Sequence, residues 1–195
     1  MFAEVMRSNL AGVCELSEPQ VERLRQHYEL LTRWNRVLNL TSLRTLEGAV
    51  ERHYCESVFA ACHLPGGAAS VADVGSGAGF PGIPIAIMRQ DCSVVLIESH
   101  QRKAAFLKEA SRELANVRVV AKRAQDVAER FDWVVSRAVR YSEIVGDLKR
   151  LGRSAELLTG EVRAEDLGGF EWREPIRLPW GERRYLRIGR NPCFT

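Results

Sequence analysis

The stretch from Asp73 to Gly82 holds the residues whose types and spacing best suit ligand binding. It reads Asp-Val-Gly-Ser-Gly-Ala-Gly-Phe-Pro-Gly, with one carboxylate and four glycines. Because glycine lacks a Cβ and tolerates positive φ, Gly75, Gly77 and Gly79 at alternate positions let a ligand approach the backbone closely. A turn that only lets a helix pack closely on a strand would explain one or two of these glycines. The loop is therefore a candidate cradle for a cofactor.

The glycine loop fits two different binding patterns. The spacing Gly77-x-Gly79-x-x-Gly82 is the dinucleotide fingerprint, in which an acidic residue about 20 positions later binds the ribose. Glu98 stands where that acid is needed. Read from its aspartate, as Asp-x-Gly-x-Gly-x-Gly, the loop is instead the first motif of the S-adenosylmethionine-dependent methyltransferases. These enzymes also carry an acid at the end of the second strand, so Glu98 fits both patterns.

Two features favour the methyltransferase pattern. Asp73 stands two residues before the first glycine, where the nicotinamide pattern needs no carboxylate but where one can hold water or the ammonium group of a methionine moiety. The nicotinamide fold also uses two mononucleotide-binding halves, whereas the rest of this chain is divided between N-terminal helices and a C-terminal hairpin. We predict S-adenosylmethionine as the cofactor, and an NAD(P)-binding Rossmann oxidoreductase is the alternative.

Helical patterns occupy the first 65 residues. Three helices are expected, a short one around 3–10, a long one from Ser17 to about Val37, and one over about 46–62. Ser17 and Gln20 form a capping box at the start of the second helix, and Pro65-Gly66-Gly67 ends the third. We interpret residues 1–65 as a helical extension and residues 66–195 as the domain that carries the glycine loop.

After the helical extension, strand and helix patterns alternate. Strands are predicted at Ser70–Val74, Ser93–Ile97, Val117–Ala121, Trp133–Ser136 and Glu156–Leu158, and helices at Pro81–Arg89, Arg102–Leu114, Gln125–Arg130 and Arg140–Leu151. Repeated β-α units imply a mainly parallel sheet covered on both faces. Phe170–Leu178 and Arg183–Gly189 predict an antiparallel hairpin at one edge. The predicted fold is α/β, a seven-stranded doubly wound sheet of the class I S-adenosylmethionine-dependent methyltransferase type.

Composition and charge are those of a soluble globular protein. Apolar residues make up 46% and charged residues 27% of the chain, and no apolar run is long enough to predict a membrane span. The five cysteines include no Cys-x-x-Cys pair, so we expect reduced thiols in a cytoplasmic protein and no metal site. Residues 100–150 contain 12 Lys or Arg against 7 Asp or Glu. Such a region suits phosphate contacts, although a solvated surface has the same composition.

The chain also contains four motifs that together resemble the RsmG (GidB) family of bacterial small-subunit ribosomal RNA methyltransferases. They are the segments Trp34–Thr41, Arg52–Ser57 and Asp73–Pro84, and the triplet Ser136-Arg137-Ala138. The resemblance extends from about Ser17 to the C-terminal hairpin. It implies S-adenosylmethionine as the cofactor and N7 of one guanine in 16S rRNA as the acceptor. The partner is then naked rRNA or the 30S subunit. We expect the protein to be a monomer.

The resemblance also implies where the cofactor is bound. By matching motif, its contacts fall on Gly75 and Phe80 in the loop, on Ala124 and Gln125 after the third strand, and on Arg137 after the fourth. Gly77 and Gly79 complete the cradle, and Glu98 matches the acid expected at the ribose hydroxyls.

Two positions depart from the family pattern. Glu56 stands where the family usually has aspartate, and Thr159-Gly160 stands where a lysine-glycine pair is usual. If that lysine contacts rRNA, the chain binds its substrate less tightly or differently. A cofactor-binding RNA module without turnover is therefore a further alternative.

The expected reaction needs positioning rather than proton transfer. Guanine N7 has a lone pair and no proton to lose, so we predict no catalytic acid or base. Positioning can supply up to about 7–11 kcal/mol. Candidate RNA contacts are Arg52, His53, Arg102, Lys103, Lys122 and Arg123, and each is also compatible with a solvated or structural role.

Overall fold

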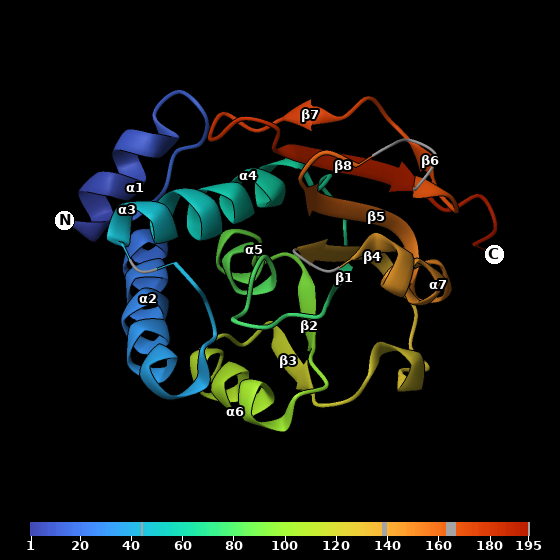
Figure 1. Cartoon of the computed structure of the whole chain (residues 1–195), viewed down its shortest axis with the longest axis horizontal. Helices are drawn as coiled ribbons and strands as arrows, with labels where there is room; N and C mark the ends of the chain where they lie inside the picture. Colours follow the sequence, from blue (N-terminus) through green and yellow to red (C-terminus); the bar gives the residue numbers. More distant parts are fainter. Residues whose placement is uncertain (44, 138–139, 163–166, 195) are drawn as a thin grey trace.

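A mixed sheet forms the centre of the molecule (Figure 1). The computed structural model describes residues 1–43, 45–137, 140–162 and 167–194. Within these residues the sheet has eight strands in the order β3-β2-β1-β4-β5-β8-β6, and β7 also pairs with β8. The strands are β1 (Ser70–Val74), β2 (Ser93–Ile97), β3 (Val117–Val120), β4 (Phe131–Arg137), β5 (Gly152–Thr159), β6 (Glu171–Trp172), β7 (Ile176–Arg177) and β8 (Tyr185–Arg190). The first five are parallel to one another, and β8 is antiparallel to β5, β6 and β7.

The predicted parallel strands are confirmed. β1 and β2 have the predicted bounds, and β3 ends one residue early. β4 and β5 are longer than predicted because they pair with each other from Phe131 and Gly152 onward. The predicted first arm of the hairpin, Phe170–Leu178, is wrong as one strand, because β6 and β7 pair separately with the two ends of β8. Pro175 lies between them and has no N–H to continue a ladder.

The helices follow the predicted pattern with one exception. They are α1 (Phe2–Leu10), α2 (Glu18–Leu38), α3 (Leu46–Ala49), the π-helical segment η1 (Val50–Cys55), α4 (Glu56–His63), α5 (Gly82–Met88), α6 (Gln101–Ala110), the 3-10 turn η2 (Ala124–Asp126) and α7 (Tyr141–Leu151). The capping box is confirmed, since the Gln20 side chain accepts the Ser17 N–H at 2.9 Å. The predicted helix Gln125–Arg130 is wrong: only η2 forms, and β4 begins at Phe131.

Helices cover both faces of the sheet. Alternate residues of β1 and β2 face opposite ways, so Val71 and Leu96 join one hydrophobic cluster and Ala72 and Val95 join the other. The first cluster receives α1, α2, η1, α4, α5 and α6, and the second receives α7. The N-terminal helices pack in the same hydrophobic cluster as one face of the sheet, with no separate core of their own among the described residues. The predicted domain boundary at residue 65 therefore stays a prediction.

Candidate cofactor-binding site

The predicted site residues lie at the carboxyl ends of the central strands. The chain runs from β1 outward to β2 and β3 and then returns to β4 on the other side of β1. In open α/β sheets, ligands bind in the crevice at such a switch point. The glycine loop follows β1, and Arg137 is the last residue of β4. Ser136 Oγ donates to the carbonyl of Val74 at 2.8 Å, which joins the two strand ends.

The glycines of the loop have two different roles. Gly75, Gly77 and Gly79 all have positive φ, between 55° and 88°. A Cβ on Gly79 would lie 2.5 Å from Ile83 Cδ1, and one on Gly82 would lie 2.6 Å from Asp73 Oδ2. These two glycines therefore permit close internal packing. At Gly77 the nearest atom to an added Cβ is 3.8 Å away, so the first part of the loop is the part that is open to a ligand.

Asp73 fastens the loop to the helix that follows it. The carboxylate is fully buried, and its Oδ2 accepts the N–H of Gly82 at 2.9 Å. Within the described residues its Oδ1 has no hydrogen-bond partner. Burial raises the pKa of Asp73 to about 7, and the nearby Glu98 acts in the same direction while the Gly82 N–H opposes it. The contact with water or an ammonium group that was predicted from the sequence stays a prediction.

Glu98 holds two loops together at the end of β2. Its carboxylate is buried and accepts the Gly77 N–H on Oε2 at 2.9 Å and the His100 N–H on Oε1 at 2.7 Å. A carboxylate has about four lone-pair sites, so both oxygens retain acceptor capacity. Glu98 is therefore placed beside the open part of the glycine loop with lone pairs left for ligand hydroxyls.

Ala124 and Gln125 lie in η2, at the same edge of the sheet. β3, which precedes η2, pairs with β2, and the Glu98 N–H donates to Val120 at 3.1 Å. Arg150 of α7 donates to the carbonyls of Ala124, at 2.5 Å, and of Val127. These bonds anchor the turn to α7, and the Ala124 carbonyl also accepts the Val127 N–H at 3.1 Å. The turn brings both predicted residues to the carboxyl end of the sheet.

Arg137 is held by residues of the N-terminal helical part. Its Nη1 donates to His53 Nδ1 at 2.8 Å, its Nη2 to the Arg52 carbonyl at 2.6 Å, and its Nε to Glu56 Oε2 at 3.3 Å. Because a guanidinium can only donate, His53 Nδ1 accepts, and the ring carries its proton on Nε2, which bonds Thr41 Oγ1 at 2.6 Å. Burial and the charge of Arg137 lower the pKa of His53 to about 3. His53 is therefore a neutral, buried part of this network.

Phe80 closes the inner side of the loop. Its ring is 5% exposed and stacks on His53 with centroids 4.6 Å apart. Tyr54 and His27 meet it edge-on at 5.0 and 5.2 Å. The aromatic side chain thus faces the helices, and it fixes the loop that the backbone presents to the crevice.

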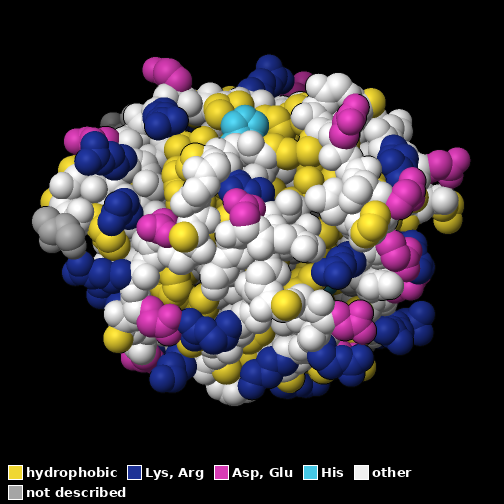
Figure 2. Space-filling model, turned by 180° about the vertical axis from the view of Figure 1, so that it is seen from behind, with side chains coloured by type: hydrophobic (Ala, Val, Ile, Leu, Met, Phe, Trp, Pro, Cys, Tyr) yellow, Lys and Arg dark blue, Asp and Glu magenta, His cyan; other side chains and the backbone are white. Residues whose placement is uncertain are grey.

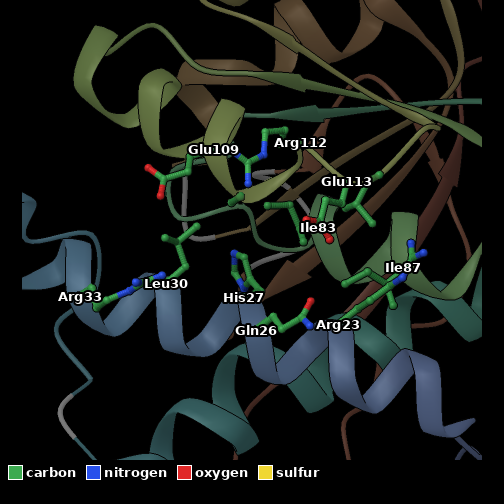
Figure 3. Close-up of a pocket in the computed structure, with 12 residues that line it drawn as sticks. Arg23, Gln26, His27, Leu30, Arg33, Ile83, Ile87, Glu109, Arg112 and Glu113 are labelled. Carbon is green, nitrogen blue, oxygen red and sulfur yellow. The ribbon is translucent and has the colours of Figure 1, made fainter.

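A separate cavity of about 250 Å³ lies between α2, α5 and α6 (Figure 3). His27 and Ile83 point into it, and arginines and glutamates of α2 and the α6 region surround its opening. The residues that line it include none of the predicted site residues. Burial lowers the pKa of His27 to about 4, so this imidazole is neutral as well.

Basic side chains accumulate near the same edge of the sheet as the loop. Arg102 and Lys103 begin α6 after β2, and Lys122 and Arg123 follow β3. Gln101 Nε2 donates to the Ala121 carbonyl at 3.4 Å, which joins the two segments. Figure 2 shows Lys and Arg side chains along the lower margin, at the level where Figure 1 places α6 and β3. The pairing of β2 with β3 brings the two segments that carry these residues to neighbouring strand ends, and their contact with RNA stays a prediction.

The two departures from the family pattern have structural explanations. Glu56 is a buried carboxylate that bonds Arg137 and Arg184. Thr159 ends β5, and its hydroxyl accepts from Arg187 Nε at 3.2 Å. Arg184 was missed by sequence reasoning because nothing near it in the sequence indicates that it meets a residue 128 positions earlier.

From the sequence we expected no metal site and no membrane span. Among the described parts of the chain, no cluster of His, Cys, Asp and Glu is arranged to hold a metal ion. No helix that the structure describes has the length and apolarity needed to cross a membrane. Ala138 of the Ser136-Arg137-Ala138 motif lies outside the described residues.

Sequence comparisons identify relatives along most of the chain. A family model described as rRNA small subunit methyltransferase G matches residues 20–158. The ribosomal RNA small subunit methyltransferase G of Chromobacterium violaceum is 40% identical over 183 residues, which cover 92% of this chain and 85% of that protein. Its counterpart in Nitrosospira multiformis is 40% identical over 157 residues, covering 78% and 70%.

Solved structures show the same fold at low sequence identity. A SAM-dependent methyltransferase from Aquifex aeolicus has a TM-score of 0.57 and 16% identity, covering 73% of this chain and 92% of that one. A ribosomal protein L11 methylase from Lactobacillus delbrueckii also has a TM-score of 0.57, with 14% identity and coverage of 69% and 77%. These likenesses confirm the predicted class I fold.

Proposed function

The chain belongs to the rRNA small subunit methyltransferase G family, and from this membership we propose that it transfers the methyl group of S-adenosylmethionine to N7 of one guanine in small-subunit ribosomal RNA. The observation that carries the proposal is the convergence of three elements at one edge of the sheet, at the switch point between β1 and β4. The open glycine loop, the buried Glu98 and the anchored Arg137 all lie at the carboxyl ends of the central strands.

The residues at the crevice fit the cofactor. Gly75 is exposed, an added Cβ on Gly77 would meet nothing closer than 3.8 Å, and Glu98 has acceptor capacity left for the two ribose hydroxyls. Gly79 and Phe80 are buried, and their N–H groups donate to the Ser76 carbonyl, so their proposed part in cofactor binding is to hold the shape of the loop.

Three further residues complete the proposed cofactor site. Ala124 and Gln125 flank the crevice from η2, and Arg137 borders it from the end of β4. Arg137 uses three of its five N–H groups on His53, Arg52 and Glu56. Among the described residues no partner is found for its other two N–H groups, and we propose that they serve a ligand.

The reaction makes modest demands on the protein. The bound sulfonium supplies an electrophilic methyl group, and guanine N7 supplies a lone pair. No proton has to leave, so the side chains need only hold the two reactants in line, which can be worth up to about 7–11 kcal/mol. The titratable groups nearest the loop are bonded within the protein rather than to a reacting proton. Asp73 accepts the Gly82 N–H, and both nitrogens of His53 are bonded to protein partners.

RNA phosphates are the proposed partners of the basic residues at this edge. Arg102, Lys122 and Arg123 are exposed beside the carboxyl ends of β2 and β3, and phosphate contacts of this kind give affinity rather than sequence choice. We place the substrate in 16S rRNA, either naked or within the 30S subunit. The cysteines are free thiols, which suits the reducing cytoplasm, and we propose that the protein acts there as a monomer.

The test is transfer of a labelled methyl group. The protein is incubated with labelled S-adenosylmethionine and with 30S subunits, or naked 16S rRNA, that lack the modification. Digestion and mass spectrometry should then find label in N7-methylguanosine. Calorimetry with S-adenosylmethionine and with NAD(P) runs in parallel. NAD(P) binding without S-adenosylmethionine binding would support the oxidoreductase alternative. Binding of cofactor and RNA without transfer would support an inactive module.

A further inference from the structure

One buried carboxylate lies among three arginines beside the proposed site. Glu56, the first residue of α4, is completely buried. Its Oε2 accepts from Arg184 Nη2 at 2.6 Å and from Arg137 Nε at 3.3 Å, and Arg52 Nε lies 3.7 Å from Oε1. The three arginines come from η1, the end of β4 and the segment before β8. The C-terminal hairpin therefore meets the N-terminal helices at this carboxylate.

The two short contacts of Glu56 are unequal. Charge-assisted N–H···O bonds are normally about 2.7–2.9 Å long, so Arg184 is the tightly bound partner and Arg137 the loosely bound one. A buried carboxylate requires cationic partners. Without Arg184, Glu56 would depend on Arg137 and on the more distant Arg52. The Arg137 guanidinium would then be drawn toward Glu56 and away from the other acceptors that now orient it.

Those other acceptors set the direction of Arg137. The bonds to His53 Nδ1 and to the Arg52 carbonyl are short, at 2.8 and 2.6 Å. They hold the guanidinium plane in one orientation while its Nε remains 3.3 Å from Glu56. The present position of Arg137 thus depends on Glu56, whose charge is balanced mainly by Arg184.

We propose that Arg184 is a positioning residue for Arg137, acting through Glu56. The inference rests on the proposed function, in which Arg137 borders the bound cofactor. Arg184 is not a catalytic residue, because its own contact is with Glu56 rather than with the crevice. The positive charge of Arg184 balances most of the charge of Glu56, so that Glu56 does not draw Arg137 out of its present position. The hairpin that carries Arg184 therefore supports the site as well as closing the edge of the sheet.

The backbone around Arg184 makes the proposal testable. The Arg184 carbonyl accepts the Leu178 N–H at 2.9 Å, and Tyr185 pairs with Thr159 in the β5–β8 ladder. Both contacts are independent of the Arg184 side chain, so Arg184→Gln should keep the hairpin folded. The adjacent Arg183 provides a matched control. Its side chain is 73% exposed and meets only the exposed Glu161 at 3.6 Å among the described ion pairs.

The first experiment measures cofactor binding by calorimetry. Arg184→Gln should weaken S-adenosylmethionine binding about tenfold, as expected when a charged hydrogen bond is disturbed. Arg184→Lys should recover most of the loss, and Arg183→Gln should stay within about twofold of the parent. The double variant Arg137→Gln/Arg184→Gln should be no weaker than Arg137→Gln, because residues that act through one another are not additive. Equal losses from Arg184→Gln and Arg183→Gln, or additive losses in the double variant, would overturn the proposal.

The second experiment does not depend on cofactor or activity. Nitrogen-15 NMR of the histidine rings reports whether His53 Nδ1 accepts a hydrogen bond. Arg184→Gln should shift the His53 signals while leaving those of His100 unchanged, and Arg183→Gln should shift neither. Unchanged His53 signals in Arg184→Gln would reject the positioning role even in an active enzyme. Shifted signals in a protein that transfers no methyl group would reject the proposed function and retain the positioning role.

Discussion

Arg137 donates a hydrogen bond to His53 across 84 positions of sequence, with 2.8 Å between Nη1 and Nδ1. The bond joins the end of β4 to the π-helical segment η1. It also fixes the tautomer of a neutral imidazole whose opposite side bonds Thr41 and whose face stacks on Phe80. Through these contacts the N-terminal helices orient a residue of the sheet.

Replacing His53 should separate its hydrogen bond from its stacking. His53→Phe keeps an aromatic face for Phe80 but leaves an N–H of Arg137 without its acceptor, which costs about 1–3 kcal/mol. We expect kcat/KM for methyl transfer to fall about tenfold or more. The control is His100→Phe, in an exposed loop residue. Equal activity of the two variants would show that the acceptor on His53 is unimportant.

The glycine that follows the loop should tolerate no side chain. In Gly82→Ala the new methyl group would lie 2.4 Å from Leu96 Cδ2 and 2.6 Å from Asp73 Oδ2. Overpacking of this kind costs about 1–3 kcal/mol, so urea unfolding should show that loss. Gly146→Ala, in α7 with no atom within 4 Å of the new Cβ, is the control. It should be stabilised by about 0.5–1 kcal/mol. A stable Gly82→Ala variant would contradict the close contact.

Acid should destabilise the protein partly through His27. Burial lowers the pKa of His27 to about 4 in the folded protein, from the ordinary histidine value of 6.5. Between these values the unfolded chain binds more protons, so stability is lost as pH falls from about 6.5 to about 4, by on the order of 3 kcal/mol. His27→Gln should remove this part of the pH dependence of urea unfolding, and His100→Gln should not. Parallel stability curves for the parent and His27→Gln would contradict the buried neutral imidazole.

Glu98 should matter for cofactor binding more than for stability. Glu98→Gln retains one acceptor but turns an amide donor toward the N–H of Gly77 or His100. We expect S-adenosylmethionine to bind about tenfold more weakly, because a charged acceptor is lost both to the loop and to the proposed ribose contact. Glu113→Gln, an exposed change outside the loop, is the control. Unchanged affinity in calorimetry would place the ribose elsewhere.

Local patterns in the sequence were sufficient to locate the parallel strands and the loop. The strand bounds of β1 and β2 follow from short β-favouring runs that end at glycine-rich or charged residues. The positive φ angles of Gly75, Gly77 and Gly79 follow from the residue type. Both features depend on neighbours in sequence, which is why they could be predicted.

Only the tertiary structure decided how the site is supported. Where the helix Gln125–Arg130 was predicted, only the turn η2 forms, and the Arg150 side chain of α7 bonds the carbonyls of Ala124 and Val127. Arg184 reaches Glu56 from 128 residues away, and no periodicity or motif carries information about such a contact. The sequence by itself determined the glycine loop and the positions of the parallel strands along the chain. The burial of Glu56, and with it the placement of Arg137, required segments distant in sequence to exclude water together.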